Sequence, residues 1–360
     1  MTRVLTFPYV FLLIVASFLS IEYPVFLAQA HAQDTGDEES ETTATSYPNL
    51  EGADRLLKEK KYVDAVLVLR KLVKISSLQT EASIRLARAL TYSGRREEAL
   101  STLWQLVDKS SGKRKEHLIQ QGRVVSKLFL TNENFQLYQD GLNLLVAGKI
   151  RAAQEKLEKA LALEPDNVEV LTRLGQALVI SGDHDSAAER LRLAKKHNPY
   201  EPNVQLWLGR ALFLRGEKQE ALNELKAASQ TLKTSQLVNL WLAESLKSSG
   251  KILEAVQVLE KDAKENPLHL QSILEMAKMR VAAVENGRDG PDQQSVLWSA
   301  RRQLQLVLSR FPEYADRFKQ FQFDVELGLE IANPTELKSQ TEALLERIET
   351  KLEEKKTATT

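Results

Sequence analysis

The sequence contains no cysteine, and glycine, proline and aromatic residues are scarce. Only 15 of 360 residues are Gly, 10 are Pro and 6% are aromatic. The absence of cysteine excludes disulfides, thiolate metal ligands and a cysteine nucleophile, but it does not indicate a compartment. Leu, Ala, Glu, Lys and Arg dominate instead, and these residues favour helices. With 43% hydrophobic residues, the chain has enough apolar surface to build a core.

The chain also lacks a net charge, because 49 Lys and Arg balance 49 Asp and Glu. A zero sum gives no reason to expect nucleic acid or an anionic membrane as a partner, although it is compatible with local patches. After the N-terminal region, no segment is long and apolar enough to span a bilayer. We therefore expect no transmembrane segment in the mature chain.

Catalytic and metal-binding motifs are absent as well. The three Gly-Lys pairs begin at Gly112, Gly148 and Gly250, and none has the Ser or Thr that follows the Lys of a phosphate loop. The five histidines show no metal-ligand spacing, and neither an HExxH nor a GxSxG motif occurs. We therefore expect no enzyme activity, no cofactor and no metal site.

The N-terminus has the pattern of a secretory signal peptide. Arg3 precedes an apolar run over residues 10–19, and small residues alternate around Ala30 and Ala32. We expect residues 1–32 to be a signal peptide that is cleaved near Ala30 or Ala32. The mature chain would then be exported, either to the periplasm or out of the cell.

An uncleaved membrane anchor is the alternative for this N-terminal segment. Glu22 and Pro24 interrupt the apolar region, which makes it a poor membrane span. Residues 33–46 are acidic and polar and contain no large apolar side chain. Their composition predicts a disordered, solvated linker.

Small residues and prolines recur every 34 residues through the middle of the chain. In the unit that ends at Pro199, apolar spacing predicts a first helix that Gly182 ends, and a second helix over about 186–196. Gly175 and Ala187 face each other in this prediction and let the two helices approach closely. The positions in register are Gly141, Gly175, Gly209, Ala243 and Ala277; Gly148, Gly182, Gly216 and Gly250; Ala153, Ala187, Ala221 and Ala255; and Pro165, Pro199 and Pro267.

These residues resemble the tetratricopeptide repeat family. Its signature includes the Leu-Gly pair, seen here at 174–175 and 208–209, the turn Gly, the Ala five residues later and the closing Pro. The resemblance implies an all-α, superhelical solenoid of tandem antiparallel helix pairs over residues 47–312, with about seven units. One departure is that no unit has Trp at the family's aromatic position, since Trp207 and Trp241 lie two residues later.

Two segments interrupt this register. Residues 114–133 add an extra helix with Leu118, Val125 and Leu128 on its apolar side. We expect one continuous solenoid with a local irregularity, and a split into two blocks is the alternative. Residues 286–293 form a polar loop inserted into the seventh unit.

We expect residues 313–356 to form helices that cap the open end of the solenoid. Tyr314, Phe318, Phe321 and Val325 lie at helical spacing after Pro312, as on a packing surface. A last helix over about 335–353 is either a second cap, which we favour, or a short oligomerisation helix.

Resemblance to the family also implies where a partner would bind, because its first helices line the inner, concave face of the solenoid. We refer to the matching positions as the predicted groove. They are Phe135, Tyr138, Leu142, Leu145, Gln176, Val179, Ile180, Leu206, Arg210, Phe213, Leu214, Leu240 and Glu244. This groove is apolar enough to take an extended segment or an amphipathic helix. The alternative is that it is narrow, or filled by the chain's own helix at 114–133.

The sequence therefore predicts a non-enzymatic scaffold or assembly factor of the cell envelope that binds a protein or peptide partner. Apolar groove residues would supply the binding energy, and Arg210, Glu169 and Glu244 would set the register. One alternative is an accessory subunit of an envelope export or polysaccharide-secretion machine, in association with an envelope complex. Another is a carbohydrate-binding or enzymatic envelope protein.

Overall fold

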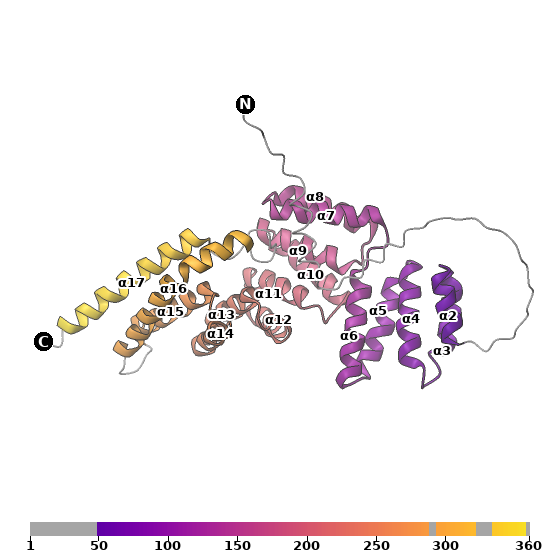
Figure 1. Cartoon of the computed structure of the whole chain (residues 1–360), viewed down its shortest axis with the longest axis horizontal. Helices are drawn as coiled ribbons and strands as arrows, with labels where there is room; N and C mark the ends of the chain where they lie inside the picture. Colours follow the sequence, from indigo (N-terminus) through magenta and orange to yellow (C-terminus); the bar gives the residue numbers. More distant parts are fainter. Residues whose placement is uncertain (1–48, 288–292, 322–332, 358–360) are drawn as a thin grey trace, which may run out of the picture. The chain divides into compact units, whose positions relative to one another are not determined.

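A computed structural model of the chain describes residues 49–287, 293–321 and 333–357. These residues form sixteen α-helices and, within the described ranges, no strand (Figure 1). Residues from Pro48 to Thr360 make up one compact unit. The predicted signal peptide and linker lie outside the described residues, as do most of the loop at 286–293 and Val325. Among the helices that are described, none is long and apolar enough to cross a membrane.

The first block consists of five helices that pack in sequence, each against the next. They are α2 (Leu50–Lys58), α3 (Tyr62–Leu72), α4 (Gln79–Tyr92), α5 (Arg96–Asp108) and α6 (Gly112–Lys127). Its core is made of small and branched aliphatic side chains, such as Ala65, Leu69 and Leu103, which are fully buried. The first two predicted units are therefore helix pairs, and α6 is the predicted extra helix, with Leu118 and Val125 buried.

The second block contains the remaining eleven described helices. They are α7 (Asn132–Val146), α8 (Ile150–Leu163), α9 (Val168–Ser181), α10 (His184–His197), α11 (Pro202–Leu214), α12 (Lys218–Thr231), α13 (Gln236–Ser248), α14 (Ile252–Glu265), α15 (Leu270–Glu285), α16 (Gln293–Phe321) and α17 (Pro334–Thr357). Four predicted units correspond to the pairs from α7/α8 to α13/α14, and α15 with α16 forms the seventh.

Two glycines of one unit show why the repeat needs small residues. Gly182 ends α9 with φ of 88°, a left-handed conformation that favours glycine. Gly175 lies where an added Cβ would come within 2.5 Å of Cγ of Leu191 in α10. The expected close approach is therefore real. The nearest partner of Gly175 is Leu191, however, rather than Ala187, because the helices cross one turn further along.

The solenoid does not continue smoothly through the extra helix. α6 packs against α4, α5 and α9 rather than stacking chiefly on α7. The buried apolar residues form one cluster in the first block and two in the second, and Tyr200 of the second block packs against the first-block cluster. Both sets of helices belong to one compact unit, and whether the repeat array is continuous or split at residues 114–133 stays a prediction.

Polar contacts at the ends of helices join the two blocks. The buried guanidinium of Arg96 in α5 pairs with Glu164 at 2.6 Å and with Asp166, and it donates to the Leu128 carbonyl. The Trp104 indole donates to the His197 carbonyl at 2.8 Å. Buried ionic and hydrogen-bonding groups are costly unless they are satisfied together, so these contacts define one arrangement of the blocks.

At the C-terminal end, the helices differ from prediction. Pro312 lies inside α16, so the expected unit boundary falls within a continuous helix. A proline in a helix interior costs about 3 kcal/mol. Packing of α16 against both α15 and α17 offsets that cost. α17 also packs on α15 and buries Leu337, Ile348 and Leu352, as a capping helix does.

Candidate functional site

Four first helices carry the predicted groove, in the order α7, α9, α11 and α13. α9 packs on α11 and α11 packs on α13, so the residues of these helices form a connected surface. Val179, Leu206, Phe213 and Leu240 belong to one apolar cluster, whereas Tyr138, Leu142 and Leu145 belong to the neighbouring one.

Five of the predicted groove residues are buried. Leu145 and Gln176 have no exposed surface, and Val179, Leu206 and Tyr138 are at most 7% exposed. For these five, the structure corrects the expectation of an open surface, because packing within and between adjacent repeats covers their side chains. The other eight positions reach the surface at least in part, with Phe135 at 37% and Leu214 at 39%.

The α7–α9 end of the predicted groove is occupied by internal contacts. Glu169 accepts a hydrogen bond from the Tyr138 hydroxyl at 2.9 Å and pairs with Arg173 and with Lys127 of α6. Burial raises the pKa of Glu169, but Lys127 and Arg173 outweigh this effect and lower it to about 2. Glu169 is therefore ionised and engaged within the chain. α6 also packs on α9. Whether it fills part of the groove stays a prediction.

At the α11–α13 end, a cation lies between aromatic rings. The Arg210 guanidinium carbon is 5.1 Å from the ring centroid of Trp207 and 4.6 Å from that of Trp241. Phe213 meets Trp241 edge to face at 5.7 Å. Burial lowers the pKa of Arg210 to about 10, so the guanidinium remains charged at neutral pH. We name Trp207, Arg210, Phe213 and Trp241 the Arg210 cluster.

Partly exposed neighbours extend the Arg210 cluster over three helices. Leu214 follows it on α11, Leu240 and Glu244 lie on α13, and Ile180 lies on α9. Glu244 pairs with Lys247 at 2.8 Å in the same turn of helix. The surface therefore combines aliphatic and aromatic side chains with charges of both signs, which suits a partner segment with apolar anchors and a few polar groups.

The sequence predicted Arg210 and Phe213 as site residues, but it did not predict that Trp207 and Trp241 contact them. Trp207 is three residues before Arg210, one turn of helix away, and Trp241 occupies the equivalent position one repeat later. Cation–π contacts of this kind strengthen as the cation is desolvated. The repeat register could have revealed this stack, because side chains at equivalent positions of adjacent first helices are neighbours.

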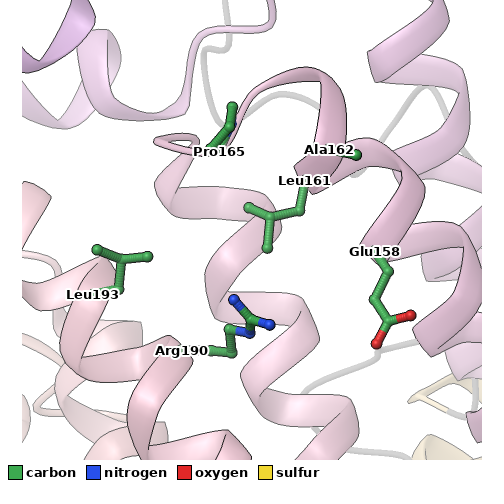
Figure 2. Close-up of a pocket in the computed structure, with 6 residues that line it drawn as sticks. All are labelled: Glu158, Leu161, Ala162, Pro165, Arg190 and Leu193. Carbon is green, nitrogen blue, oxygen red and sulfur yellow. The ribbon is translucent and has the colours of Figure 1, made fainter.

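A shallow hollow of about 390 Å³ lies on the second helices, outside the predicted groove. Leu161 of α8 and Arg190 of α10 face the same space, with Glu158 and Leu193 on either side (Figure 2). Ala162 and Pro165 complete its lining. Few polar groups converge there, so it has the character of a surface depression between two repeats rather than of a catalytic pocket.

No chemistry-bearing cluster accompanies these surfaces in the described ranges. Groups of three or more His, Asp or Glu that could hold a metal ion are not found there. Two histidines lie at the ends of α10, His184 at its start and His197 at its end, and burial lowers the pKa of His197.

Comparisons with known proteins agree with the repeat geometry. Two family models, both described as tetratricopeptide repeat, match residues 144–206 and 181–232. These ranges run from the end of α7 through α12, and the same helix pairs continue on either side. The chain is a tetratricopeptide repeat protein. None of the curated proteins compared with it matches.

Solved tetratricopeptide structures align with about half of this protein. MamA from Desulfovibrio magneticus (residue 41 to the end) is 15% identical, covers 51% of this chain and 99% of its own, and gives a TM-score of 0.44. A thermophilic tetratricopeptide protein of Thermus thermophilus is 18% identical, covers 52% and 97%, and gives 0.41. Another MamA structure, at 21% identity, covers 56% and 98% with a TM-score of 0.40.

Proposed function

We propose that this tetratricopeptide repeat protein is a scaffold that binds a segment of another protein through its Arg210 cluster and the apolar residues around it. The main support for this proposal is that the Arg210 guanidinium lies close to the rings of two tryptophans on consecutive repeats. Phe213 and the exposed Leu214 lie beside it. Trp207 is only 1% exposed and supports the cluster from within the core, whereas Arg210 and Trp241 are partly exposed. Tryptophan and arginine are residue types that dominate binding energy at protein interfaces. The repeat fold agrees with a protein-binding role in general.

Apolar anchors on the partner would pack on Phe213, Leu214 and Leu240, and charged groups near Arg210 and Glu244 would fix its register. We place the site at the α11–α13 end of the predicted groove, because five of its residues reach the surface there. These residues are Arg210, Phe213, Leu214, Leu240 and Glu244. The site that we propose is thus smaller than the one predicted from sequence.

We further propose that this scaffold acts in the cell envelope. The support is the signal-peptide pattern of residues 1–32, in which a basic start precedes an apolar run and small residues. The partner would then be an envelope protein, and capture of a membrane channel would favour the accessory-subunit alternative over a free scaffold.

A crosslinking capture from envelope extract tests the site. The full chain is compared with a Phe213→Glu, Leu214→Glu variant whose helical circular dichroism is unchanged. A matched control carries Leu163→Glu and Leu253→Glu, two exposed leucines on second helices. We expect the groove variant to lose a partner that the wild type and the control both retain. Equal capture by all three proteins would exclude the Arg210 cluster as the binding site.

A further inference from the structure

Charge is unevenly distributed along the chain although its sum is zero. Residues 49–131, which contain the first block, hold 17 Lys and Arg against 9 Asp and Glu. The second block and the N-terminal segment carry the compensating negative charge. The zero net charge of the whole chain does not explain why residues 49–131 are basic, so the reason must lie in the first block itself.

The cations of the first block differ between its two ends. At the end that contacts the second block, several cations are in ion pairs, whereas Lys58 and Lys60 of the α2–α3 turn form none with a described residue. Arg96 binds Glu164, Lys127 binds Glu201 at 3.0 Å, and Arg95 binds Glu98. At the opposite end, six cations form no ion pair with any described residue. We name these six the basic end: Lys71, Lys74, Lys109, Lys113, Arg114 and Lys115.

Topology brings the basic end together from two turns. α4 and α6 pack on each other and run parallel, because α5 reverses the chain direction between them. The α3–α4 turn and the α5–α6 turn therefore lie at the same end of the block, the lower end in Figure 1. Five of the six side chains are exposed, and Lys115 is half-buried. Glu81, Asp108 and Glu116 are the carboxylates at this end, so its six cations leave it with a net positive charge.

The sequence at the start of α6 conflicts with ordinary helix electrostatics. The N-terminal end of a helix carries a partial positive charge, which favours acidic residues there. α9 and α10 follow this rule with Glu169 and Asp185, whereas α8, α11, α13 and α15 have no acidic residue in the first turn. What sets α6 apart is the run of three cations. The first turn of α6 has no acidic residue and instead holds Lys113, Arg114 and Lys115, and its N-cap Ser111 makes no side-chain capping hydrogen bond. A bound anion would relieve this repulsion, and local rules are most often broken at functional sites.

We infer that the basic end binds the headgroups of an anionic lipid bilayer and orients the repeat array on a membrane surface. Lysine provides five of the six cations, and protein interfaces are depleted in lysine and enriched in aromatic residues and arginine. The Tyr200 hydroxyl lies 3.5 Å from Asp108, next to Lys109, but its ring packs against Trp104 and is therefore already engaged rather than open to nucleic-acid bases. Flexible lysines at the ends of side-by-side helices suit a broad anionic surface, where each cation adds to the attraction. This membrane contact goes beyond the proposed function and involves no residue of the predicted groove.

Vesicle sedimentation of the full chain tests the inference. Binding is compared between vesicles of phosphatidylcholine alone and of phosphatidylcholine with phosphatidylglycerol in equal amounts, at low and at high salt. One variant changes all six residues of the basic end to Gln. The matched control changes six exposed cations of the second block to Gln: Lys149, Arg151, Lys159, Lys226, Lys233 and Lys264. Residues 1–48 are the same in all three proteins, so their contribution to binding cancels.

We expect the wild type and the control to prefer anionic vesicles, and salt to weaken this preference. The basic-end variant should lose this preference by a factor on the order of 10⁴, given about fivefold for each of its six cations. Its thermal stability should not fall, because the changes remove repulsion at the start of α6. An equal preference in the variant, or no preference in the wild type, would overturn the inference. Binding of DNA or of a polyglutamate peptide through the same six residues, without vesicle binding, would overturn it in favour of those polyanions.

Discussion

Arg96 in α5 and Glu164 after α8 form a buried ion pair of 2.6 Å across 68 residues of sequence. Arg96 is 1% exposed and Glu164 is 5% exposed. Glu164 also accepts a hydrogen bond from the Leu130 backbone at 2.8 Å, in the segment where the repeat register is broken. This charge pair is one of several polar contacts between the two blocks, and it lies where the repeat register is interrupted.

Replacing Arg96 with Met should destabilise the protein by about 3–5 kcal/mol, because it leaves the Glu164 carboxylate buried without its counter-ion. Chemical denaturation monitored by circular dichroism measures the change. The double variant Arg96→Met, Glu164→Leu should recover most of the loss, since an apolar pair replaces the ionic one. Arg70→Met, which removes a largely exposed pair with Glu98, serves as the control and should cost less than about 1 kcal/mol. A comparable loss in the control would contradict a special role of Arg96.

Substituting Gly175 by Ala should cost about 1–3 kcal/mol, because its Cβ would lie 2.5 Å from the buried Leu191 side chain. Gly182→Ala should cost about 1–2 kcal/mol for a different reason, the φ of 88° at the end of α9. Urea unfolding separates the two causes when it is repeated in a Leu191→Ala background. There the Gly175→Ala cost should vanish while the Gly182→Ala cost persists. If Gly175→Ala remains as destabilising in the Leu191→Ala background, the contact with Leu191 is not the reason that position 175 requires glycine.

Stability should fall in acid as Glu169 becomes protonated. Its pKa is lowered from 4.5 to about 2 in the folded protein, so the stability that it contributes is present above pH 4.5. That contribution is lost as the pH falls from 4.5 toward 2, by at most about 3 kcal/mol. Denaturation midpoints of the wild type and of Glu169→Gln measure this difference across the same range. Glu155→Gln, on the exposed surface of α8, is the control. An acid transition in Glu169→Gln as steep as in the wild type would refute this assignment.

The repeat register in the sequence predicted the helix pairs but not their long-range contacts. Gly182 and Pro199 predicted where helices end because glycine and proline act through local backbone geometry. The predicted helix end at Pro312 is wrong, because α16 continues through this proline and is stabilised by tertiary packing. The pairing of Arg96 with Glu164 left no local signal, because it depends on how two blocks separated by an irregular segment meet.

For the predicted groove, too, the sequence predicted which residues lie together but not which of them are exposed. The repeat placed Phe213 and Leu240 in one apolar cluster, as helical period and repeat length require. It could not show that Leu145 and Val179 are buried, because exposure depends on neighbouring helices. The role of the thirteen residues in binding a partner stays a prediction.

Site-specific photo-crosslinking tests the central claim most directly. A photoreactive amino acid would be placed at Leu214 on the first-helix surface, and separately at Leu163 and Leu253 on second helices. We expect a discrete crosslinked partner when the photoreactive amino acid is at position 214, and none when it is at position 163 or 253. Crosslinks from 163 or 253 alone would contradict it and place the partner on the opposite helices of the repeats.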